Sequence, residues 1–430
     1  MCIRDSPYID RILAGESDIL WPGRPRYLAK TSGTTSGAKY IPITPASMPH
    51  HIHTARNGIL NYVAATKAPI FGGRMIFISG SPTLDTKAGI PTGRLSGIIN
   101  HEIPSWAKGN QLPTWETNCI EDWEAKLDRI VEETHNQDLR LISGIPPWVQ
   151  MYYERLLAKT GKSTIKEVFP NLSLFIHGGV NYEPYRAVMD GLHGGHVDVL
   201  ETYPASEGFI AYQDDYLDEG LLLNTDAGMY YEFVPLNEVG AEHPTRLTLS
   251  EVEKGVDYAL IISSNAGLWG YEIGDTVRFT SLAPYKIRVS GRVKHFISAF
   301  GEHVIGKEVE QAMREVCEAL GLRVREFSVA PQIQPPEGGL PYHEWLVEWQ
   351  DSPADPERVA RMLDASLCEQ NIYYQDLIQN GVLQRLKIKA LAPDTFRSYM
   401  KSRGKLGGQN KVPRLTNDRQ MADRLLETRV

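Results

Sequence analysis

The sequence predicts an α/β protein with two domains: a large N-terminal domain of layered α/β sheets plus a small β-barrel-like part, and a smaller α+β domain at the C-terminus. Short β-rich runs alternate with amphipathic stretches up to about Gly291, and a group of strands without intervening helices closes that part. The pattern then changes after Arg292. We therefore expect domains at residues 1–293 and 294–430.

The first elements expected are two strands joined by a polar loop, and later a helix flanked by strands. Residues 27–29 and 40–44 are short apolar or β-branched runs on either side of the loop. A helix over residues 146–159 begins with two prolines, which a first helical turn tolerates, and Gly161 lies just beyond its end. The flanking strands are expected at residues 139–142 and 172–176.

The end of the large domain and the C-terminal domain follow different patterns. An antiparallel sheet or a small barrel is predicted from four strand-like runs, at residues 230–234, 258–262, 277–280 and 286–289. In the C-terminal domain, a helix over residues 306–320 carries one apolar stripe, formed by Val309, Met313, Val316 and Leu320. With it we expect strands at 324–330, 342–349 and 383–391, a helical region at 356–378 and a helix at 396–403.

Composition and charge exclude several classes of function. With 430 residues, 42% of them hydrophobic and 23% charged, the chain falls in the ordinary globular range. A formal net charge of −8 argues against nucleic acid or an anionic membrane as the main partner and favours a small anionic ligand. The four cysteines show neither disulfide nor zinc spacing. No apolar run approaches the ~20 residues of a membrane helix and no secretory signal is visible, so we expect a cytoplasmic protein without an obligate protein partner.

The segment from Thr31 to Lys39, TSGTTSGAK, has the composition of a phosphate-binding loop. Glycines let the backbone approach phosphate oxygens, hydroxyl and N–H groups donate to them, and the Lys39 ammonium neutralises charge. It is not a Walker loop, because only three residues separate Gly33 from Gly37 and Tyr40 follows Lys39. A polar hairpin turn is the alternative interpretation. As a phosphate loop, the segment predicts ATP binding.

A second segment, residues 201–208 with the sequence ETYPASEG, also suits a nucleotide. It follows a strand-like run from His196 to Leu200, and α/β sheets place ligands at the C-terminal ends of their strands. Tyr203 is suited to stacking on a base, Ser206 to donating to a phosphate, and Glu207 to holding Mg²⁺, which prefers hard oxygen ligands. An ordinary turn at the end of a strand is the alternative.

A third segment places an acidic residue after a glycine. Asp275 follows Gly274, and we expect it to open a strand and to accept hydrogen bonds from both ribose hydroxyls, with Arg292 beside it. A tight turn capped by Asp275 is the alternative.

Taken in order, these segments resemble the acyl-adenylate-forming enzymes. The series is TSGTTSGAK, HGGV at residues 177–180, YPASE, GYEIGD, GRVK and GEHV. Within that superfamily the chain is similar to the auxin-responsive acyl-acid amido synthetase family, because of the Ser-rich loop, ISGIPPWVQ at residues 142–150, the YPASE form and QNKVPRL at residues 409–415. The resemblance covers nearly the whole chain. Family members possess a segment before the loop that is missing here, so we expect a truncated N-terminus.

The resemblance implies a role for each matching residue. Those that it places around ATP are Thr31, Ser32, Gly33, Thr34, Thr35, Ser36, Gly37, Lys39, Gly178, Gly179, Val180, Tyr203, Ser206, Asp275 and Arg292. Glu207 would hold Mg²⁺ at the α-phosphate, and Lys411 would be the catalytic lysine of the mobile C-terminal domain. Lys294 would match the hinge, where many relatives have an acidic residue.

The implied reaction is ATP-dependent. A carboxylic acid attacks the α-phosphorus of ATP and expels pyrophosphate, and the acyl group then passes to the amine of an amino acid with release of AMP. The small acid and the amino acid would be the partners. Two rivals remain open at this point: an acyl-CoA ligase that shares the adenylation step, and a non-catalytic nucleotide-binding protein.

Histidines and aromatic residues give weaker signals. His50, His51 and His53 suggest a metal site, but no cysteine or carboxylate lies at ligand spacing, so we favour solvated or partly buried side chains at the start of a helix. Trp148, with Tyr152 and Tyr153, lies on a helix that suits either the protein core or the acid pocket.

Overall fold

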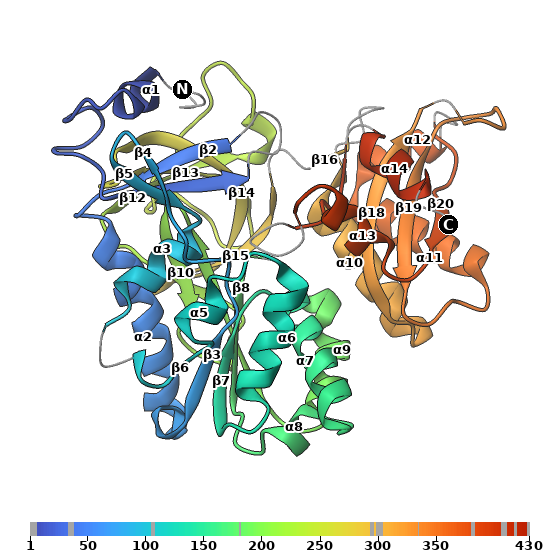
Figure 1. The fold of residues 1–430 in the computed structure, drawn as a ribbon. Helices are drawn as coiled ribbons and strands as arrows, with labels where there is room; N and C mark the ends of the chain where they lie inside the picture. Colours follow the sequence, from blue (N-terminus) through green and yellow to red (C-terminus); the bar gives the residue numbers. More distant parts are fainter. Residues whose placement is uncertain are drawn as a thin grey trace.

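The computed structural model describes residues 7–32, 38–104, 108–179, 182–292, 296–297, 304–333, 335–379, 383–405, 411–416 and 419–427. The chain forms a large part that ends at Arg292 and a small part whose described residues begin at Phe296, and the two lie side by side (Figure 1). Each part has hydrophobic clusters of its own. The predicted boundary between residues 293 and 294 lies outside the described residues.

One sheet of eleven strands runs through the large part. Its parallel half holds the strands β6 (Gln111–Leu112), β3 (Arg74–Phe77), β7 (Leu139–Ser143), β8 (Leu174–Gly178) and β9 (Asp198–Ala205). Its antiparallel half continues with β10 (Gly208–Gln213), β11 (Leu221–Leu223), β15 (Tyr285–Arg292), β14 (Leu268–Leu282), β13 (Asp257–Ser264) and β12 (Met229–Pro235). The sheet therefore changes from parallel to antiparallel between β9 and β10.

Helices cover both faces of the parallel half (Figure 1). On one face, the apolar sides of α6 (Trp123–Thr134), α7 (Pro146–Thr160) and α9 (Glu183–His193) form a core with β3, β7 and β8. On the other face, α2 (Met48–Thr66) packs on the same strands through Tyr62. Parallel sheets are stable when both faces are covered in this way.

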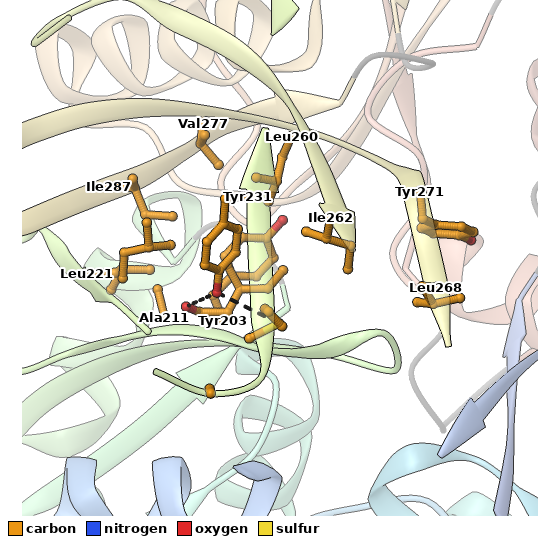
Figure 2. Packing of buried hydrophobic residues seen from close by; sticks show 14 of the residues in the cluster. Tyr203, Ala211, Leu221, Tyr231, Leu260, Ile262, Leu268, Tyr271, Val277 and Ile287 are labelled. Carbon is orange, nitrogen blue, oxygen red and sulfur yellow. Dashed lines mark hydrogen bonds between the residues drawn. The ribbon is translucent and has the colours of Figure 1, made fainter. Parts of the chain in front are cut away.

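The antiparallel half packs against a second, four-stranded sheet. That sheet has the order β2 (Ala38–Ile43), β1 (Tyr27–Ser32), β5 (Ile90–Gly93) and β4 (Asp85–Lys87). Figure 2 shows Tyr231, Leu260 and Val277, from β12, β13 and β14, pointing into the core that the two sheets share. The remaining short elements of the large part are α1 (Pro7–Leu13), η1 (Ile70–Gly72), α3 (Leu95–Glu102), α5 (Trp115–Asn118), α8 (Ile165–Val168) and η2 (Leu236–Glu238).

The small part is a three-stranded sheet between two pairs of helices. The strand order is β18 (Val324–Gln332), β19 (Tyr342–Trp349) and β20 (Lys387–Leu391), and β16 (Phe296–Ile297) pairs separately with β17 (Val304–Ile305). One face of the sheet packs on α10 (Gly306–Leu320) and α11 (Pro356–Gln370), and the other on α13 (Thr395–Ser402) and α14 (Gln420–Glu427). The helix α12 (Ile372–Gln379) follows α11.

Most predicted elements are confirmed, but several boundaries are wrong. The strand predicted at residues 383–391 begins only at Lys387, and the helical region predicted at 356–378 is divided into α11 and α12. The strand predicted to end at Leu200 runs on to Ala205, because β10 turns back and pairs with it. Asp275 does not open a strand but lies within β14, where the pairing with β13 shifts and Gly274 has a φ of 85°. The predicted antiparallel strands are present and extend the large sheet.

Candidate active site

A cavity of about 2370 Å³ lies between the large and small parts. It begins at the C-terminal ends of the parallel strands, where α/β sheets usually bind ligands. Eight of the residues predicted from the sequence line it: Thr31, Gly178, Gly179, Tyr203, Ser206, Glu207, Asp275 and Lys411. The fold thus brings together segments that are up to several hundred residues apart in the chain.

The backbone comes very close to its neighbours at the end of β8. Gly178 lies opposite Thr202 of β9, and a Cβ added to Gly178 would lie 2.8 Å from the Thr202 hydroxyl and 3.2 Å from Pro204 Cδ. Gly179 has a φ of 78°, which favours glycine. Together the two glycines leave a bare backbone surface at the cavity wall, which suits the close approach of a flat ring.

Tyr203 and Asp275 connect the two halves of the large sheet. The Tyr203 hydroxyl donates to Asp275 Oδ2 at 2.6 Å, and both side chains are buried. Asp275 also lies in register with Arg292 on the neighbouring strand β15. The hydrogen bond holds the carboxylate against the aromatic ring, so that a ligand stacked on Tyr203 would have the Asp275 oxygens at its edge.

The described ends of the predicted phosphate loop lie on β1 and β2, which pair antiparallel. Thr31 pairs with Lys39 across the two strands, and Thr31 faces the cavity. Residues 33–37, Val180 and Lys294 lie outside the described residues, so their assigned roles stay predictions. The side chains of Ser32, Lys39 and Arg292 are likewise outside the description.

Ser206 and Glu207 form the turn between β9 and β10, in which Gly208 pairs back with Ala205. Both line the cavity. Within the part of the chain that the structure describes, no group of three or more His, Cys, Asp or Glu side chains is arranged to hold a metal ion. The assignment of Glu207 to Mg²⁺ stays a prediction.

Lys411 enters the cavity from the small part. A Cβ added to Gly179 would lie 3.6 Å from both Cε and Nζ of Lys411, so the lysine side chain passes directly over the glycine. The segment behind it is tied to β18, because Ser328 Oγ donates to the Pro413 carbonyl at 2.7 Å and Val329 N to the Arg414 carbonyl at 2.9 Å. The position of Lys411 therefore follows the position of the small part.

Arg94 and Glu201 are two of the charged cavity residues that the sequence analysis did not identify, and neither has a charged partner in the described part of the chain. Arg94, just before α3, is half-buried, and its guanidinium makes no hydrogen bond or ion pair with any described residue; burial lowers its pKa. Glu201 of β9 has a largely buried carboxyl group that is likewise without such a contact in the described ranges. Burial raises the pKa of Glu201 to about 7, against the opposing charges of Arg288 and Arg186.

Two histidines of the cavity wall are buried in a way that favours their neutral form. His51 on α2 and His177 at the end of β8 are each 3% exposed. Burial lowers the pKa of His51 to about 4 and that of His177 to about 3. His177 stacks on Tyr182 with 4.6 Å between ring centroids and so supports the glycine segment from behind.

The predicted aromatic residues of α7 have different positions. Trp148 is buried and also lines the cavity, packing on Trp123 with 4.7 Å between ring centroids. Tyr152 and Tyr153 are fully buried in the core between α7 and the sheet. Trp148 is therefore the one of the three that faces the site.

Family models match three stretches of the chain. Residues 5–111 match the GH3 family N-terminal domain, residues 222–292 the GH3 family central domain, and residues 307–420 the GH3 family C-terminal domain. Together these ranges cover more than half of the chain.

Curated relatives carry similar sequences. The indole-3-acetic acid-amido synthetase GH3.3 of Arabidopsis thaliana is 30% identical over 212 residues, which are 47% of this chain and 35% of the relative. The jasmonoyl–L-amino acid synthetase GH3.5 of Oryza sativa subsp. japonica is 22% identical, with 97% of this chain and 85% of the relative covered. The matches with the indole-3-acetic acid-amido synthetases span about a third to a half of those relatives' length.

Solved structures share the fold. A GH3.15 acyl acid amido synthetase superposes with a TM-score of 0.81 at 16% sequence identity, covering 99% of this chain and 85% of that one. A 2-hydroxyisobutyryl-CoA ligase follows with a TM-score of 0.52 at 13% identity, covering 93% and 76%. With its three matching domains in their order along the sequence, the chain belongs to the GH3 family.

Proposed function

We propose that the chain is an ATP-dependent acyl-acid amido synthetase. It would adenylate a carboxylic acid and transfer the acyl group to the amine of an amino acid. The observation that carries the proposal is the position of Lys411 over Gly179, in the same cavity as the Tyr203–Asp275 pair. The ammonium group of Lys411, from the small part, thus lies in the same cavity as the predicted adenosine site of the large part.

ATP fits the residues present. Gly178 packs so closely on Thr202 and Pro204 that no Cβ fits there, which leaves only backbone at this point of the wall, and Tyr203 offers a ring for stacking. The Asp275 carboxylate, oriented by the Tyr203 hydroxyl, can accept hydrogen bonds from a ribose. On this assignment the phosphates extend toward the β1–β2 hairpin, Ser206 and Lys411.

The first step joins two anions. A carboxylate oxygen of the acid attacks the α-phosphorus, the bond from that phosphorus to the bridging oxygen breaks, and pyrophosphate leaves. Lys411 supplies positive charge where negative charge accumulates, and the two parts of the molecule hold the reacting atoms in line. Glu207 would hold Mg²⁺ together with phosphate oxygens, an arrangement common for this ion, which neutralises phosphate charge when bound.

Arg94 is suited to hold the carboxylate of the acid. Its guanidinium has no protein partner among the described residues, and Leu95, Ile99 and Trp148 line the same cavity. A cation in a cavity that also has apolar lining residues favours an organic acid with an apolar body. The relatives are named for indole-3-acetic acid and for the jasmonoyl group, and both acids belong to that class.

In the second step the amine nitrogen of the amino acid attacks the acyl carbon. The bond from that carbon to the AMP oxygen breaks, AMP leaves, and the amine loses a proton to the solvent. Lys411 must then move away for the acceptor to enter, which a rotation of the small part about the segment near Lys294 would achieve.

The test is ATP–pyrophosphate exchange with a panel of aryl, indolyl and aliphatic acids, followed by mass spectrometry of the products formed with amino acids or with CoA. Acid-dependent exchange and an N-acyl amino acid are expected. A product formed only with CoA would favour an acyl-CoA ligase. ATP binding without exchange for any acid would favour a nucleotide-binding protein without this catalysis.

A further inference from the structure

Among the described residues, polar contacts connect the small part to the large part at three places away from Lys411, of which the pair of Lys307 with Asp257, at 4.0 Å, is the longest. Glu124, in the first turn of α6, pairs with two cations of α13: Arg397 at 2.5 Å and Lys401 at 3.5 Å. On the other side, Tyr185 of α9 contacts Glu326 and Arg414 of the small part, each at 3.4 Å. Both helices of the large part pack on its parallel half.

The ion pair at Glu124 connects the two parts but is partly exposed, so it is weak enough to break. The Glu124 side chain is 34% exposed and Arg397 33% exposed, so solvent weakens their attraction. Despite the opposing effect of burial, Arg397 and Lys401 lower the pKa of Glu124, so its charge is retained at neutral pH. The other cation beside Glu124, Arg155, also pairs with Asp128 of the same helix and donates to the Glu124 carbonyl.

The contact at Tyr185 reaches the Lys411 segment directly. Arg414 is three residues beyond Lys411, and its guanidinium pairs with Glu326 and with Glu310, the latter at 3.2 Å. It also donates to the Phe327 carbonyl at 2.9 Å. Tyr185, 5% exposed, adds a hydroxyl from the large part to this buried network. The network therefore joins the α9 helix to the segment that carries Lys411.

We infer that Glu124 and Tyr185 are positioning residues for the first half-reaction: they hold the small part where Lys411 lies over Gly179. This inference rests on the proposed function. Neither residue touches a reacting atom in this assignment. Because a partly exposed ion pair and a long hydrogen bond are individually weak, the same contacts can break once the adenylate has formed and the small part must turn.

The variant Glu124→Gln tests the inference, with Glu132→Gln as the matched control. Glu132 lies on the same helix and pairs with Lys159 of α7, within the large part, at 2.5 Å. Glu124→Gln is expected to lower the rate of ATP–pyrophosphate exchange by about threefold to tenfold, and Tyr185→Phe to act in the same direction. Transfer from a supplied acyl-adenylate to an amino acid should stay within about twofold of wild type.

Two further readouts separate positioning from a general loss of structure. The double variant Glu124→Gln/Arg397→Gln should be no slower in exchange than the slower single variant, since Arg397→Gln removes a contact between the parts that Glu124→Gln has already removed. Raising the ionic strength should slow exchange by the wild type more than by Glu124→Gln. Equal losses in both half-reactions, or exchange as fast as in the control, would overturn the inference.

Small-angle X-ray scattering of the free proteins tests the positioning without any reaction. Glu124→Gln should show a larger radius of gyration than wild type and Glu132→Gln. If the wild type exchanges with no acid, the proposed function fails while scattering still decides the inference: opening in Glu124→Gln alone supports it, and identical curves overturn it.

Discussion

Glu201 gives the clearest case of a single residue whose energetics follow from its position. Burial raises the pKa of this carboxyl group to about 7, from an ordinary value of 4.5. The raised pKa means that the folded state disfavours the charged form. The group therefore costs nothing below pH 4.5, destabilises the fold increasingly as the pH rises to about 7, and keeps that cost above pH 7.

Replacing this carboxyl group with an amide should remove the cost. Glu201→Gln is expected to raise the free energy of unfolding at pH 8 by up to about 3 kcal/mol, and by much less at pH 5, because one pKa unit corresponds to about 1.4 kcal/mol. Urea denaturation at both pH values measures this. Glu154→Gln, on the exposed side of the same cavity, is the control. An equal effect at both pH values would show that Glu201 is not buried as described.

Arg94 should determine the affinity for the acid. Arg94→Gln is expected to raise the KM for the acid by about tenfold or more, because a charge-assisted hydrogen bond is lost, while the KM for ATP changes little. Steady-state kinetics with the acid that supports exchange measure both constants. Arg129→Gln, on the exposed face of α6, is the control. A larger change in the KM for ATP than in the KM for the acid would indicate that Arg94 binds phosphate instead of the acid.

The sequence identified the residues with recognisable motifs but not these two. Gly178, Tyr203 and Asp275 stand in patterns of glycine, aromatic and acidic residues, and the structure brings them together. Arg94 and Glu201 are ordinary charged residues in the sequence. What distinguishes them is that neither side chain has a protein partner within the described structure. Whether a side chain finds a partner depends on long-range packing, which leaves no local pattern in the sequence.

At the scale of elements, the end of β8 limits what the site tolerates. Gly178→Ala would place a Cβ against Thr202 and Pro204 of β9, so the strand must shift. We expect a loss of about 1–3 kcal/mol in the free energy of unfolding, together with loss of exchange. Gly191→Ala is the matched control, since Gly191 lies in α9 with no atom within 4 Å of an added Cβ, and alanine favours helix. Similar thermal midpoints for the two variants would contradict this close packing.

Elements with strong local signals were predicted well. The helix α10 has the predicted bounds, because its apolar stripe is regular, Glu308 accepts from Ile305 N at 2.9 Å, and Gly321 ends it with a φ of 64°. The end of β9 was wrong, since pairing with β10 extends a strand beyond its apolar run. Local patterns describe helices better than strands, whose ends depend on partners.

At the scale of the whole molecule, the cavity is completed by two parts that meet. The described helices include none that is long and apolar enough to cross a membrane. Lys411 comes from the small part, whereas Gly179, Tyr203 and Asp275 come from the large part. The order of motifs predicted that these segments meet, but only the three-dimensional arrangement shows the small part placed with Lys411 in the cavity.

The measurement that tests the central claim most directly is acid-dependent ATP–pyrophosphate exchange by the wild type and by Lys411→Ala, with ATP affinity measured by calorimetry. Lys405→Ala, which removes an exposed lysine of the same cavity, is the control. We predict acid-dependent exchange by the wild type, a loss of about 100-fold or more in Lys411→Ala, and a change in the Kd for ATP of less than about threefold. Absence of exchange in the wild type, or equal losses of exchange and ATP affinity in Lys411→Ala, would contradict it.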